Sequence, residues 1–71
     1  FEIFEYVISS SMAVSGKKIK DINMRNKGVI AGITTKGKNL IPTGSYQIEP
    51  GDILIVCAGR ENIGFISQIF A

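Results

Sequence analysis

The sequence predicts a small α+β domain whose elements follow the order β-α-β-β-β-α, with helices packed on a mostly antiparallel sheet. Isoleucine is abundant, with 13 Ile against 2 Leu, and this bias favours strands over helices. Short β-branched runs alternate with turn residues such as Gly, Pro and Asn, which is the pattern of successive strands. Residues 60–70 instead place apolar side chains at helical spacing.

The N-terminal third is predicted to hold one strand and one short helix. Residues 2–8 form the strand, because aromatic and β-branched side chains run over a strand's length. Both of its faces carry apolar groups, so one face is expected to join the core and the other to meet a partner. After a serine-rich loop, residues 16–23 are expected to form a helix that buries Ile19 and Ile22, with Ser15 as its N-cap.

The middle of the chain predicts a β-hairpin. Residues 29–35 form a β-branched strand, and small residues at its centre leave space for close packing or for a ligand. Gly37 is expected to adopt a positive φ in the tight turn that follows. Residues 39–42 then form a short strand, which Pro42 restricts to the edge of the sheet.

The C-terminal part predicts a central strand and a closing helix. A turn at residues 49–52, with Pro and Gly in adjacent central positions, leads into this part. Residues 53–58 are the most apolar run, so we expect a central strand covered on both faces. Cys57 lies in this run and is interpreted as a core thiol rather than a nucleophile. The helix over 60–70 is amphipathic.

The chain lacks the disulfides and structural metal sites that usually stabilise a small domain. With 71 residues it makes one domain and buries roughly 60% of the surface of its unfolded form. It has one Cys and no His, so neither an intrachain disulfide nor a tetrahedral zinc site can form. We therefore expect oligomerisation or a covalent neighbour, and the start at Phe1 suggests a fragment of a longer protein. No run approaches the roughly 18 apolar residues of a membrane span.

The charge is unevenly distributed. Seven of the eight cations lie within residues 17–38, where Asp21 is the only acid. This segment is either a solvated face or a surface that attracts anions. Nucleic-acid binding is not favoured, because the cations are not interleaved with aromatic residues and the pI is only about 8.9.

No catalytic constellation can be assembled. Without His the usual general base near neutral pH is missing, and the Asp and Glu residues lie beside turns or on strand positions expected at the surface. Residues 32–39 match a phosphate-loop pattern except that Asn39 replaces the Ser or Thr that would bind magnesium. A helix should follow such a loop, whereas Pro42 follows here. We expect no enzyme activity and no metal.

Four short motifs occur in a definite order. Residues 16–25 read Gly-Lys-x-hydrophobic-x-Asp-hydrophobic-x-hydrophobic-Arg, and residues 28–33 read Gly-Val-hydrophobic-hydrophobic-x-Ile before the basic hairpin at 36–38. Residues 40–42 are hydrophobic-Ile-Pro, and residues 47–54 contain x-hydrophobic-x-x-Gly-Asp-x-Leu. In this order and spacing, essentially the whole chain resembles the TrkA C-terminal (RCK C-terminal) regulatory domain of bacterial potassium-transport and cation antiporter proteins.

The resemblance implies a cytoplasmic ligand sensor. Such domains form homodimers and sit behind a nucleotide-binding domain or the membrane-embedded part of a transporter or antiporter. Some members bind cyclic di-AMP at the two-fold interface. Carried onto this chain, the resemblance assigns ligand binding to Arg25, Asn26, Val29, Ile30, Ile41 and Pro42.

The chemistry of these residues suits a nucleotide. Arg25 can pair with a phosphate or stack on a base, and Ile, Val and Pro side chains can cover adenine faces. The sequence leaves open a second role for Arg25, a salt bridge with Asp21 one helical turn earlier. We therefore expect a non-catalytic homodimeric sensor at the cytoplasmic face of the membrane. The alternative is the effector-binding domain of a transcription regulator, because related domains are also fused to DNA-binding domains.

Overall fold

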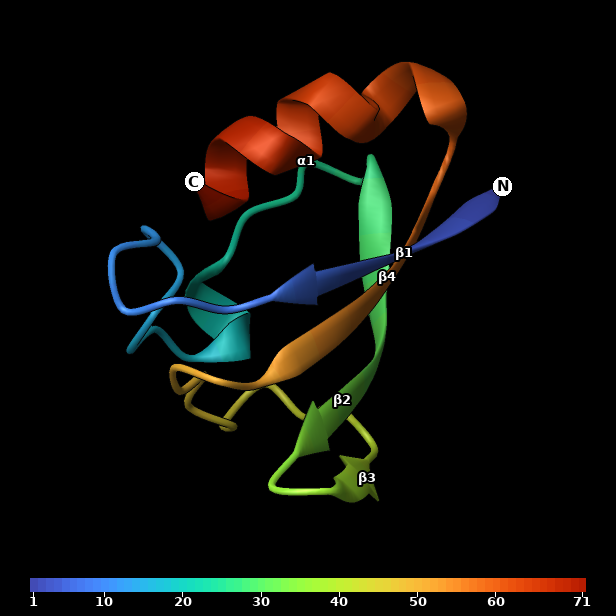
Figure 1. Ribbon diagram of the computed structural model, residues 1–71. Helices are drawn as coiled ribbons and strands as arrows, with labels where there is room; N and C mark the ends of the chain where they lie inside the picture. Colours follow the sequence, from blue (N-terminus) through green and yellow to red (C-terminus); the bar gives the residue numbers. More distant parts are fainter.

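The computed structural model describes all 71 residues as a four-stranded antiparallel sheet followed by a C-terminal helix (Figure 1). This architecture confirms the predicted α+β class. In chain order the elements are β1 (Glu2–Val7), the 3-10 turn η1 (Ile19–Asp21), β2 (Gly28–Thr35), β3 (Lys38–Leu40), β4 (Ile53–Ala58), the 3-10 turn η2 (Arg60–Asn62) and α1 (Ile63–Phe70).

The sheet has the strand order β1-β4-β2-β3. The apolar strand β4 lies at the centre, as predicted, and pairs antiparallel with β1 on one side and β2 on the other. The register of β2 against β4 shifts between Ile30 and Gly32, which indicates a bulge at Ala31. Strand β3 pairs with residues 33–35 of β2 and not with residues 28–32, so the outer edge of β2 is free of a strand partner in its first half.

One face of the sheet packs against α1. Leu54, Val56 and Ala58 alternate along β4 and are fully buried, together with Ile66 and Phe70 of the helix. This arrangement follows from the period-2 alternation of a strand and the apolar stripe of an amphipathic helix. Figure 1 shows α1 at the opposite end of the molecule from the β2–β3 hairpin.

The other face of the sheet is open. Ile3, Val7 and Val29 are 72%, 66% and 63% exposed, and the alternate residues of β4 are only half-buried. We expected both faces of residues 53–58 to be covered, but in the single chain only one face is. Cys57 lies on the open face, half-buried between Ile3 and Val29. The prediction that Cys57 is a core residue is therefore wrong.

Residues 16–23 differ from the predicted helix. Only the single turn η1 forms there, and Ser15 does not cap it, because Lys18 holds the N-cap position. The segment pairs with the loop before β4 instead: the Ile19 N–H donates to the Tyr46 carbonyl at 3.0 Å, and the Lys20 N–H to the Gly44 carbonyl at 2.9 Å. These long-range bonds replace the local bonds that a longer helix would make.

The hairpin after β2 forms as predicted. Lys36 and Gly37 both have positive φ, 50° and 78°, which is the geometry of a two-residue type I′ turn. Residues 32–39 are thus strand, turn and strand, and the near-match to a phosphate loop has no following helix.

Candidate functional site

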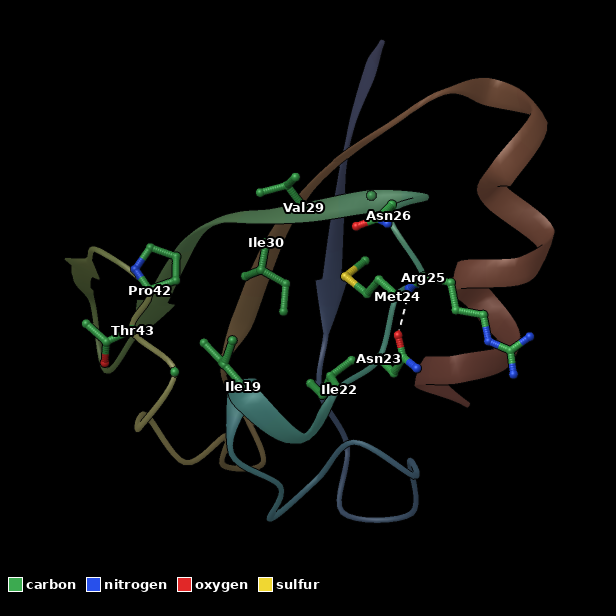
Figure 2. Close-up of a pocket in the computed structure, with 12 residues that line it drawn as sticks. Ile19, Ile22, Asn23, Met24, Arg25, Asn26, Val29, Ile30, Pro42 and Thr43 are labelled. Carbon is green, nitrogen blue, oxygen red and sulfur yellow. Dashed lines mark hydrogen bonds between the residues drawn. The ribbon is translucent and has the colours of Figure 1, made fainter.

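A hollow of about 470 Å³ lies beside the free edge of β2. Three stretches of chain surround it: the η1 segment with the corner that follows, the start of β2, and the loop after β3. Its lining residues are Ile19, Ile22, Asn23, Met24, Arg25, Asn26, Gly28, Val29, Ile30, Pro42, Thr43 and Gly44. Figure 2 shows Ile19, Ile22 and Ile30 grouped together, with Pro42 and Thr43 on the side of this group away from Arg25.

Backbone hydrogen bonds hold the two irregular walls together. The bonds from Ile19 to Tyr46 and from Lys20 to Gly44 fix the η1 segment against the loop that carries Thr43. Within that loop, the Tyr46 N–H donates to the Thr43 carbonyl at 3.1 Å. The hollow therefore depends on contacts between distant parts of the chain.

The corner between η1 and β2 has an unusual backbone. Arg25 and Asn26 have φ of 52° and 60°, in the left-handed region that Asn tolerates but Arg adopts at a cost of about 1 kcal/mol. The Asn23 side chain stabilises the corner, because its Oδ1 accepts the Arg25 N–H at 3.0 Å. The Lys27 N–H donates to the Met24 carbonyl at 2.9 Å and closes the turn.

The Arg25 side chain leaves the hollow that its backbone lines. Figure 2 shows it extending toward α1, away from Ile30 and Pro42. Its guanidinium carbon lies 5.9 Å from the centre of the Phe65 ring, within the range of a cation–π interaction. The alternative salt bridge with Asp21 is not formed, since the single ion pair of the structure joins Arg60 to Glu2 at 2.5 Å.

Five of the six residues assigned by the resemblance come together here. Arg25, Asn26, Val29, Ile30 and Pro42 all line the hollow, although Pro42 is distant from the others in sequence. Ile41 does not line it, and its side chain is 87% exposed next to Pro42.

The sequence interpretation missed the remaining lining residues. It predicted Ile19 and Ile22 to be the buried face of a helix, but both are half-buried and face the hollow. Their i, i+3 spacing was the available signal, since it places two apolar side chains on one side of a short turn. The local sequence gave no comparable signal for Asn23, Met24, Thr43 and Gly44. Thr43 and Gly44 reach the hollow only because long-range hydrogen bonds bring the loop after β3 to η1.

A buried carboxylate braces the loop that forms one wall. Asp52 is only 2% exposed, contrary to the expectation that the acids lie at the surface. Its Oδ2 accepts the Tyr46 hydroxyl at 2.6 Å and the Glu49 N–H at 3.0 Å. Burial acts to raise the pKa of Asp52, but hydrogen bonds from Thr35, Tyr46 and the Glu49 N–H outweigh it and lower this pKa below its ordinary value.

The lining of the hollow is mixed in character. Apolar side chains such as Ile19, Ile22 and Ile30 line it together with the polar side chains of Asn23, Asn26 and Thr43. Its volume is within the range of small-molecule sites. No cluster of three or more His, Cys, Asp or Glu side chains is placed to hold a metal ion. No helix is long and apolar enough to cross a membrane.

Comparison with protein families and curated proteins gives a consistent result. The family model of the TrkA-C domain matches residues 3–71. The K(+)/H(+) antiporter NhaP2 of Shewanella baltica (strain OS223) is 31% identical over 71 residues, which are 100% of this chain and 12% of that protein. NhaP2 of Shewanella oneidensis shows the same identity and coverage. The chain thus spans about 12% of the length of these relatives.

Solved structures share the fold. The RCK_C domain dimer of S. agalactiae BusR in complex with c-di-AMP has a TM-score of 0.80 at 22% identity, covering 99% of this chain and 96% of that one. A structure of an RCK domain with cda has a TM-score of 0.77 at 17% identity and covers 100% of both chains. BusR in complex with its busAB-promotor DNA has a TM-score of 0.79 at 22% identity, covering 96% of this chain and 35% of that one.

Proposed function

The chain belongs to the TrkA-C domain family, and we propose that it is the non-catalytic, ligand-sensing regulatory domain of a potassium or cation transport protein. Its 30–31% identity to K(+)/H(+) antiporters over all 71 residues supports this reading. In such a protein the domain would lie at the cytoplasmic face of the membrane and respond to a solute inside the cell.

The proposed ligand is cyclic di-AMP, bound in the hollow beside β2. One observation carries this proposal: Arg25, Asn26, Val29, Ile30 and Pro42, which the family resemblance assigns to the ligand, line one hollow of suitable volume. The BusR RCK_C domain, which has the same fold, was solved in complex with c-di-AMP. Ile30 and Pro42 would cover an adenine face, and Arg25 would reach a phosphate.

The proposed assembly is a homodimer with the ligand on its two-fold axis. Cyclic di-AMP is itself two-fold symmetric, so two copies of the hollow can each hold one half of it. Val29 is 63% exposed and Ile41 is 87% exposed, and both lie in or next to the hollow. A second copy would cover these apolar side chains, which a free monomer leaves in water.

The alternative is an effector domain of a transcription regulator. The likeness to BusR bound to promotor DNA favours it. That likeness is at 22% identity, whereas the antiporters reach 31% over the whole chain. We therefore prefer the transport protein.

Titration calorimetry with cyclic di-AMP on the 71-residue chain tests the ligand. We expect one ligand per two chains. Arg25→Ala should weaken binding by about tenfold to a hundredfold for each arginine, because a hydrogen bond to a charged group contributes about 1.5–3 kcal/mol. Arg60→Ala is the matched control, since it removes the same charge from an exposed side chain that does not line the hollow.

The outcomes separate the parts of the proposal. An absence of heat with the wild-type chain would exclude this ligand. Equal losses in Arg25→Ala and Arg60→Ala would show only a general charge effect and would move the site elsewhere. Sedimentation in the presence of ligand should give a dimer, and a ligand-bound monomer would contradict the two-fold arrangement.

A further inference from the structure

Two cations lie close to one aromatic ring at the corner of the hollow. The Arg25 guanidinium carbon is 5.9 Å and the Lys27 Nζ is 5.5 Å from the centre of the Phe65 ring. Neither cation has a carboxylate partner, since the ion pair of the structure is formed by Arg60 and Glu2. Phe65 is therefore the group that holds the free Arg25 side chain.

The ring is held in place because the helix that carries it is anchored by two buried residues that follow Phe65. Ile66 and Phe70 of α1 are 1% and 0% exposed and pack into the core against the sheet. Phe65 itself is half-buried. A cation attracted to this ring is held over α1 and hence outside the hollow, as Figure 2 shows for Arg25.

We propose that Phe65 is a positioning residue for the ligand site, holding Arg25 outside the hollow in the free protein and surrendering it when an anionic ligand binds. This inference rests on the proposed function and adds to it a regulated arginine. A phosphate in the hollow and the Phe65 ring compete for one guanidinium, so the ring reduces the affinity for the ligand.

Lys27 lowers the free-energy cost of moving the Arg25 side chain away from the Phe65 ring. When Arg25 turns toward the hollow, Lys27 remains near the ring, so the Phe65 ring keeps a cation partner. The backbone does not need to move, because the bond from the Arg25 N–H to Asn23 holds the corner while the side-chain torsions change. The competition is thus confined to one flexible side chain.

Phe65→Leu and Phe65→Tyr test this role. Leucine keeps an apolar side chain but removes the ring, whereas tyrosine keeps the ring. With Arg25 released, Phe65→Leu should bind cyclic di-AMP about two- to fivefold more tightly for each arginine, the range expected for an exposed cation–π contact. Phe65→Tyr should bind like the wild type. In the Arg25→Ala background, Phe65→Leu should no longer change the affinity, because the residue on which the ring acts is gone.

Proton NMR of the free chain provides a readout that does not depend on the ligand. The Arg25 Hδ and Lys27 Hε protons should show ring-current shifts in the wild type and in Phe65→Tyr, and lose them in Phe65→Leu. On addition of cyclic di-AMP, only the Arg25 shifts should disappear.

The results distinguish this inference from the proposed function. Binding of equal or lower affinity in Phe65→Leu would overturn the inference and leave the ligand assignment intact. Absence of binding in every variant would overturn the proposed function and the competition with it. Absence of ring-current shifts in the free wild type would refute the Arg25–Phe65 contact whatever the ligand does.

Discussion

Replacing the buried Asp52 with Asn should destabilise the domain and disturb the hollow. The carboxylate accepts the Tyr46 hydroxyl at 2.6 Å and the Glu49 N–H at 3.0 Å, both on Oδ2. An amide of the same shape turns two charge-assisted bonds into neutral ones, which are about half as strong. With about 1.5–3 kcal/mol for each charged bond, halving both gives an expected loss of about 1.5–3 kcal/mol in total. The core of a domain this small supplies only about 3–5 kcal/mol.

Urea unfolding followed by far-ultraviolet circular dichroism measures this loss, because the chain has no Trp. The chain concentration must be the same for every variant, since a dimer's stability depends on it. Glu49→Gln is the matched control: it removes the same charge three residues earlier, from an exposed side chain, and should stay within about 0.5 kcal/mol of the wild type.

The acid limb of stability provides a second test of the same carboxylate. Its pKa is lowered in the folded state, so its contribution is present above the unfolded pKa of about 3.9. This contribution is lost as the pH falls through the folded pKa. Asp52→Asn should therefore flatten the loss of stability below about pH 4. A variant within about 0.5 kcal/mol of the wild type, with an unchanged acid limb, would refute the reasoning.

Two glycine substitutions should separate a packing effect from a backbone effect. Gly28→Ala places a Cβ 2.7 Å from Ile66 Cδ1 and 3.1 Å from Met24 Cε. The ends of Ile66 and Met24 are flexible, whereas Ala58 Cβ at 3.2 Å can yield only with its backbone, so we expect a loss of about 1–2 kcal/mol in urea unfolding, and a larger loss for Gly28→Val. Gly37→Ala meets no atom within 4 Å but keeps a φ of 78°, so it should lose about 1–2 kcal/mol through strain alone. No loss in Gly37→Ala would contradict the assigned hairpin turn.

Local patterns were sufficient for the strands but not for the segments around the hollow. The β-branched runs over β2 and β4 predict strands wherever they pack, because alternation is a property of the strand itself. Residues 16–23 match a helix equally well locally, yet their backbone groups pair with residues 44–48. The same limit applies to Cys57, since an apolar run does not tell which of its faces the chain covers itself.

The resemblance selected residues that the fold places around one hollow, but it could not predict the direction of the arginine side chain. The order of the motifs indicated the family, the family resemblance assigned Arg25, Ile30 and Pro42 to ligand binding, and the fold places all three around one hollow. The orientation of Arg25 depends on Phe65, which lies far along the chain on the C-terminal helix. No pattern around Arg25 carries that information.

The proposed ligand would bind to the same contacts that hold this part of the fold together. The hollow has one regular wall, β2, and two irregular walls joined by the bonds of Ile19 and Lys20 to the loop. That loop is in turn braced by Tyr46 on the buried Asp52. A ligand that touches both irregular walls would add contacts between two segments that few hydrogen bonds join. At a concentration one hundred times its dissociation constant, a ligand stabilises the folded state by about 2.7 kcal/mol. This gain is comparable with the loss expected from Asp52→Asn. Under the proposed function, occupancy of the hollow would therefore order the η1 segment and its loop, and this change in order would transmit the presence of the ligand to the rest of the protein.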